Sequence, residues 1–177
     1  GDVEIGKVTG RVELKTSGGD VTALEVIGDA ELETSGGDIV VGNVKGACTT
    51  STSGGDIKVG KVEKTLVAST AGGDITIEDV GGDARASTAG GDVIVGMVSG
   101  SATLKTAGGD IELRGATGRV EAKTAGGDIE CSNITGSISA GTAGGDVYAE
   151  LNPSGTGMNS LETAGGGDEL VGHAADG

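Results

Sequence analysis

Apolar and polar residues alternate along this chain in short segments separated by glycines. Between residues 75 and 80, the apolar residues Ile75, Ile77 and Val80 are separated by polar ones. A period of two is typical of a β-strand with one buried face. A helix is not expected, because glycine recurs throughout and the apolar residues do not follow a 3.6-residue period. The pattern therefore predicts an all-β protein.

The alternating pattern repeats every 18 residues. The tripeptide Gly-Gly-Asp recurs eight times at this interval, and residues 1–144 align as eight units without an insertion or deletion. Positions 3, 5, 8, 12 and 14 of most units are apolar, so each unit holds two short strands joined at turn glycines. Such a repeat predicts a single-stranded parallel β-solenoid of about nine to ten coils, stacked about 4.8 Å apart. We expect right-handed coiling, as in most connections between parallel strands.

The regular coils are expected over residues 1–151, followed by a loop-interrupted last coil and a cap-like tail over residues 152–177. The interruption is expected at Asn152 to Gly157. Beyond it, we expect Thr163 to continue the repeat, Asp168 to extend the aspartate series at an interval of 22, and Glu169 to replace the usual Val or Ile. The spacing leaves open whether each coil has two or three sheet faces.

Stacking places equivalent residues of successive coils in columns. The aspartates are expected to accept backbone N–H bonds at the glycine turns, and a line of Ca²⁺ sites is the alternative. The threonines are expected to point inward or to a corner, with hydroxyls that are satisfied from coil to coil. These columns are formed by Asp20, Asp38, Asp56, Asp74, Asp92, Asp110, Asp128 and Asp146; by the turn glycines Gly19, Gly37, Gly55, Gly73, Gly91, Gly109, Gly127 and Gly145; and by Thr16, Thr34, Thr52, Thr70, Thr88, Thr106, Thr124 and Thr142.

No catalytic constellation is visible, so the sequence predicts neither enzymatic activity nor a cofactor. Cys48 and Cys131 lie five coils apart in inward columns, too far for a disulfide, and are expected to be buried thiols. His173 is the only histidine. The only aromatic residue is Tyr148, so the core must be narrow and filled by Val, Ile, Leu, Ala and Thr.

Charge and composition limit the partners. The formal net charge is -15 and the basic residues are not clustered, which argues against nucleic acid and anionic membranes. No apolar stretch approaches the ~18 residues of a spanning helix, so direct membrane insertion is not expected. Because the chain begins within the repeat, we expect an excised or processed segment.

The sequence GDITIEDVGGDARASTAGGDVIVGMVSG, with repeated Gly-Asp-Ile/Val and intervening Val-x-Gly, resembles the bacterial and archaeal adhesin family of envelope β-solenoids. This resemblance implies a location at the cell surface, outside the cell or in the periplasm, and no enzymatic activity. It favours a rigid spacer with an unidentified surface ligand. The alternatives are a filament subunit that self-associates through the solenoid ends, and a cation- or glycan-binding module.

Overall fold

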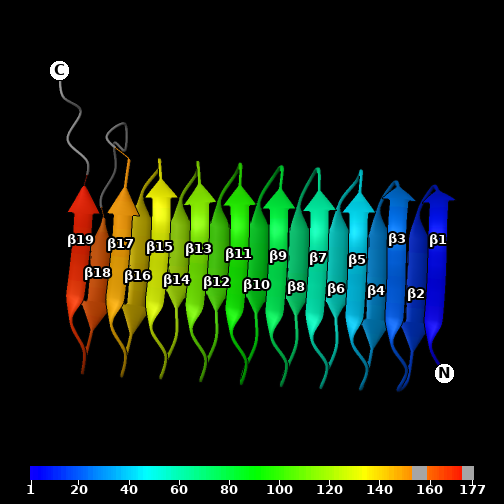
Figure 1. Cartoon of the computed structure of the whole chain (residues 1–177), viewed down its shortest axis with the longest axis horizontal. Coiled ribbons are helices and arrows are strands. Elements are labelled where there is room, and N and C mark those ends of the chain that lie inside the picture. Colours follow the sequence, from blue (N-terminus) through cyan, green and yellow to red (C-terminus); the bar gives the residue numbers. More distant parts are fainter. Residues whose placement is uncertain (153–158, 173–177) are drawn as a thin grey trace.

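The computed structural model describes residues 1–152 and 159–172, which form a flat parallel β-solenoid of about nine coils (Figure 1). The prediction of an all-β solenoid with 18-residue coils is confirmed, and each coil has two sheet faces. We name the ten-stranded sheet A and the nine-stranded sheet B. Sheet A contains β1 (Val3–Thr9), β3 (Val21–Ile27), β5 (Ile39–Val44), β7 (Ile57–Val62), β9 (Ile75–Val80), β11 (Val93–Val98), β13 (Ile111–Ala116), β15 (Ile129–Ile134), β17 (Val147–Leu151) and β19 (Asp168–Gly172). Sheet B contains β2 (Val12–Thr16), β4 (Ala30–Thr34), β6 (Cys48–Ser51), β8 (Leu66–Ser69), β10 (Ala84–Ser87), β12 (Ala102–Lys105), β14 (Val120–Lys123), β16 (Ile138–Thr142) and β18 (Ser160–Thr163).

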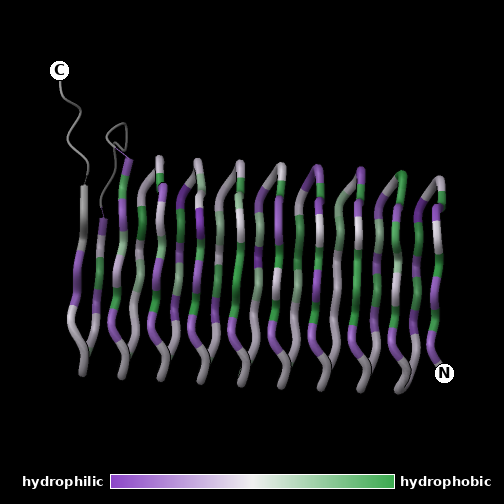
Figure 2. The backbone as a smooth tube through the Cα atoms, viewed as in Figure 1, coloured by the Kyte–Doolittle hydropathy of each residue, from purple (hydrophilic) through white to green (hydrophobic). Residues whose placement is uncertain are grey.

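Strand pairing follows the sequence repeat directly. Each strand pairs in parallel with the equivalent strand of the next coil, so that Ile57 lies beside Ile75 and Ile75 beside Val93. The hydrophobic stretches consequently recur at matching places along successive strands (Figure 2). A slip of one residue would turn the whole apolar set outward, and the buried faces therefore hold the register.

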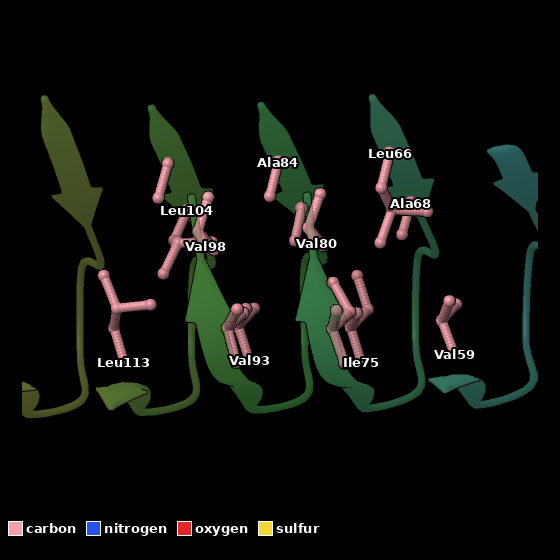
Figure 3. Close-up of a cluster of buried hydrophobic side chains, with 14 of the residues drawn as sticks. Val59, Leu66, Ala68, Ile75, Val80, Ala84, Val93, Val98, Leu104 and Leu113 are labelled. Atoms are coloured by element: carbon pink, nitrogen blue, oxygen red, sulfur yellow. The ribbon is translucent and has the colours of Figure 1, made fainter. Parts of the chain in front are cut away.

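The core is a thin layer of aliphatic side chains between the two sheets. In Figure 3, Ile75, Val80 and Val93 of sheet A approach Ala84 and Leu104 of sheet B; Ile75 and Val93 are completely buried. Branched and small aliphatic side chains together fill this narrow space without aromatic rings, as the composition implied.

The apolar residues at position 3 form a buried column, as the period of two indicates. Every member from Val21 to Val147 is at most 1% exposed, whereas Val3 is half-buried because no described coil packs on its outer side. The neighbouring Lys58 faces solvent.

The last coil differs from its predicted register. Thr163 does occupy the threonine column, and its hydroxyl donates to the Gly145 carbonyl at 2.8 Å. The aspartate position, however, is taken by Gly167, whose N–H donates to the Asp146 carboxylate at 2.8 Å. Asp168 therefore pairs with Val147 at the inward position 3, where it is exposed.

The expectations for Asp168 and Glu169 were thus wrong by one residue. The third consecutive glycine, Gly167, occupies the aspartate position. The last coil is therefore offset from the preceding one by 21 residues, not by the 22 residues that separate Asp168 from Asp146. Glu169 consequently pairs with Tyr148, not with the inward Val or Ile column. Most of the loop predicted at 152–157, and His173, lie outside the described residues.

Candidate functional site

The most regular chemical feature is the edge at which each coil passes from sheet B to sheet A. We call it the Gly-Gly-Asp edge; it comprises positions 16–18 of one coil and positions 1–2 of the next, and lies along the lower side of Figure 1. Its sequence is Thr-Ser/Ala-Gly-Gly-Asp in every regular coil. Strands end here because the glycines allow the chain to turn tightly.

The aspartates connect each coil to the next. Asp74 accepts a hydrogen bond at Oδ1 from the N–H of Asp92, and Asp92 accepts one from the N–H of Asp110, both at 2.8 Å. The same bond recurs along the edge from Asp2 to Asp146, at 2.8–3.0 Å. One carboxylate oxygen of each aspartate therefore has a structural partner. Among the described residues, no group of three or more His, Cys, Asp or Glu side chains could hold a metal ion.

The threonines bond to the turn backbone on both sides. Thr88 donates its hydroxyl proton to the Gly73 carbonyl at 2.8 Å, and its oxygen accepts the Gly91 N–H at 3.3 Å. The expected satisfaction from coil to coil thus runs through backbone groups rather than from hydroxyl to hydroxyl. Thr34, Thr52, Thr70, Thr106, Thr124 and Thr142 repeat this arrangement and, like Thr88, are at most 7% exposed.

The turn glycines are needed because successive coils approach closely. A Cβ atom at Gly91 would overlap the Gly73 carbonyl oxygen and approach the Asp74 carboxylate. An alanine there would force the backbone of the two coils apart.

The opposite edge contains two further aspartates that sequence reasoning missed. Asp29 accepts the N–H of Ala47 at 2.9 Å, and Asp83 accepts the N–H of Ser101 at 2.8 Å. Their signal is the Gly-Asp dipeptide at positions 10 and 11, which matches the dipeptide at positions 1 and 2.

Ion pairs between successive coils lie on the outer surface. Lys15 pairs with Glu33, and Lys45 with Glu63, each at 2.9 Å. The hydrogen bond from Lys45 lowers the pKa of Glu63, and the hydrogen bonds to Glu33 and Glu63 raise the pKa of Lys15 and Lys45. All these groups are exposed to solvent, and such pairs typically contribute little to stability.

Both cysteines are free, buried thiols, as predicted. Burial raises the pKa of Cys48 to about 12, and burial also raises the pKa of Cys131 to about 12, with a smaller effect from Glu130. A thiol with so high a pKa is a poor nucleophile at neutral pH.

The geometry of this edge defines a structural class, a repetitive parallel β-solenoid whose coils are joined by backbone and side-chain hydrogen bonds. Residues 47–170, more than half of the chain, match the family model described as Toastrack DUF4097, and the chain belongs to this family. Comparisons with curated proteins and with solved structures gave no match. No helix among the described residues is long and apolar enough to cross a membrane.

Proposed function

We propose that this chain is a non-enzymatic structural element, a rigid spacer on the cell surface or in the envelope that holds other parts of a protein or assembly at a fixed distance. The single observation that carries this proposal is the continuity of bonding between coils. Every junction between regular coils combines two strand pairings with the aspartate and threonine bonds of the Gly-Gly-Asp edge.

This bonding favours stiffness over adaptability. Bending the rod would stretch the inter-coil hydrogen bonds on its convex side and compress the coils on its concave side, because the bonds between coils run parallel to its axis. At about 4.8 Å per coil, nine coils span about 43 Å. The described chain offers no long insertion between β1 and β17 in which a deep binding site could form.

A display experiment tests the spacer role. The chain would be placed between a membrane anchor and a fluorescent tag on a cell surface, and the height of the tag would be measured by fluorescence interference. Deleting residues 55–90, two complete coils, should lower the tag by about 10 Å. Deleting residues 91–126, also two complete coils, should have the same effect.

Equal shortening by both deletions is expected of a spacer, because only the number of coils matters. Different heights after equal deletions, or a height that does not change, would contradict it. A separate experiment tests the surface location proposed here. Protease added to intact source cells should cleave the native chain only if the chain is exposed outside the cell.

The filament and ligand-binding alternatives predict different results. A filament subunit should form open-ended polymers by axial stacking in solution. A cation- or glycan-binding module should lose ligand binding after one deletion and keep it after the other, because its ligand contacts specific coils.

A further inference from the structure

Asn133 begins the tripeptide Asn133-Ile134-Thr135. An asparagine followed two residues later by threonine or serine is the acceptor sequence for asparagine-linked sugars, provided that the middle residue is not proline. Of the four asparagines in the chain, Asn133 alone has this sequence. The others are followed by proline or lack a hydroxyl residue two positions later; they are Asn43, Asn152 and Asn159.

The side chain of Asn133 is exposed on the outer face of sheet A, near the end of β15. It occupies position 7 of its coil, where Lys61 and Asp79 are exposed in theirs. The φ angle of Asn133 is 53°, and no other described residue except glycine has a positive φ. Asparagine adopts this left-handed conformation more readily than most residues. The fold therefore holds this asparagine at the surface in a conformation that suits it.

The neighbouring coils leave room beside this side chain. β15 and β17 lie side by side near one end of the rod (Figure 1), and β15 has one residue more at this point, so that Ser132 and Asn133 together face Glu150. Such a bulge commonly re-aims a side chain at the surface. On the other side lies Gly115, which has no side chain and is covered by the long, flexible side chain of Met97. A bulky group on Asn133 can therefore extend away from the sheet.

The amide nitrogen of Asn133 can be substituted without loss of its hydrogen bond. Nδ2 carries two protons, and it donates one of them to the Arg114 carbonyl oxygen at 3.1 Å. A sugar linked to Nδ2 replaces one proton and leaves the other. The contact with Arg114 can thus persist in the modified chain.

We propose that Asn133 is an N-glycosylation site. The co-substrate is an oligosaccharide joined to a pyrophosphate through its anomeric carbon, and the host supplies it together with the transferase. Nδ2 forms a bond to the anomeric carbon, and the bond from that carbon to the pyrophosphate oxygen breaks. The pyrophosphate leaves with the electron pair, and the displaced Nδ2 proton passes to a base of the transferase. The proposal rests on the surface location proposed above, because such sugars are found on the surface of secreted chains.

The contacts of Thr135 place the transfer before this coil packs. Its N–H donates to the Ala116 carbonyl at 2.9 Å, and its hydroxyl accepts a hydrogen bond from Asn152 Nδ2 at 3.5 Å. β15 also pairs with β13 and β17. An enzyme that binds Asn133 and Thr135 together needs both residues free of these contacts. The exposure of Asn133 in the folded rod then allows the modified coil to pack with its sugar outside.

Mass spectrometry of the native chain isolated from its source cells tests this proposal. Cleavage after glutamates gives residues 131–150, in which Asn133 is the only asparagine, and residues 34–63, in which Asn43 is the only one. The first peptide should carry the mass of an oligosaccharide, located on Asn133 by fragmentation. Asn43 is the internal control, because it is also exposed at position 7 but is followed two residues later by Lys45. It should be unmodified.

Two substitutions made in the source cells separate the acceptor sequence from the fold. Thr135→Ala should leave Asn133 unmodified, whereas Thr135→Ser should keep the oligosaccharide, because serine also provides the hydroxyl. Thermal melts of both variants show whether the fold is kept.

An unmodified Asn133 in the native chain, an oligosaccharide that remains on Asn133 in Thr135→Ala, or a modified Asn43 would overturn the proposal. Protease added to intact cells distinguishes its failure from that of the surface location. An unmodified Asn133 on a chain that the protease reaches contradicts the glycosylation site alone. An unmodified Asn133 on a chain that the protease does not reach contradicts the surface location as well.

Discussion

Replacing Thr88 by valine tests whether the threonine column holds successive coils together. Valine has nearly the same shape as threonine and favours strands, so the main change is the loss of the hydroxyl. That hydroxyl donates to the Gly73 carbonyl at 2.8 Å and accepts the Gly91 N–H at 3.3 Å, and Thr88 is 6% exposed. The variant therefore leaves a donor and an acceptor without partners at the turn.

The expected cost follows from these two groups. Leaving a buried polar group unsatisfied costs about 1–3 kcal/mol. The longer bond is donated by the Gly91 N–H. Because Gly91 is half-buried, this N–H can bind water in the variant, which lowers the cost of losing the bond. The added methyl group returns about 0.8 kcal/mol through burial. We expect a net loss of about 1–2 kcal/mol in the free energy of unfolding.

Urea denaturation followed by far-ultraviolet circular dichroism measures this loss. Thr103→Val is the matched control, because Thr103 is a half-buried outward residue of β12 whose hydroxyl forms no hydrogen bond with another described residue. It should change stability by less than about 0.5 kcal/mol. Equal effects of the two substitutions would refute a specific role for the threonine hydroxyls.

Four further predictions concern the aspartates and the cysteines. Asp92→Asn should keep or raise the melting temperature, since the amide oxygen still accepts the Asp110 N–H while repulsion from neighbouring carboxylates about 4.8 Å away decreases; Asp92→Ala, which removes the acceptor, should lower it. Chelation by EDTA followed by added Ca²⁺ should shift the melting temperature little, and a fall of more than about 10 °C that Ca²⁺ reverses would instead support a line of cation sites. Cys48 and Cys131 should resist iodoacetamide at pH 8 in the folded chain and react after unfolding, as measured by mass spectrometry. Because folding raises both thiol pKa values from 9.0 to about 12, their contribution to stability should be present below pH 9 and lost as the pH rises toward 12, and a Cys48→Ala, Cys131→Ala variant should lose less stability over that range.

The repeat made the architecture predictable because one local pattern is copied at a fixed interval. Burial of Ile57 and Ile75 follows from alternation alone, and the parallel pairing of their strands follows from the 18-residue period. The number of sheet faces did not follow, because it depends on how sharply the chain turns at glycines rather than on which residues are apolar.

The bonding at the Gly-Gly-Asp edge was only partly predictable. An aspartate beside turn glycines is expected to accept N–H groups, but the donor to Asp74 is the amide of Asp92, 18 residues away. Such a partner becomes evident only once the coils are stacked. In the last coil, Gly167 took the place of an aspartate because its backbone N–H can make the same bond, which needs no particular side chain on the donor.

The distance between two coils tests the rigid rod most directly. Spin labels would be attached at Lys15→Cys and Lys123→Cys, exposed positions of β2 and β14 on sheet B, in a chain whose native cysteines are replaced by alanine. Six coils separate them, so pulsed electron resonance should give one narrow distance distribution near about 29 Å, allowing for the length of the labels. Deleting residues 73–90, one complete coil, should shorten this distance by about 5 Å and keep the distribution narrow. A broad distribution, or a distance that does not change after the deletion, would contradict the account.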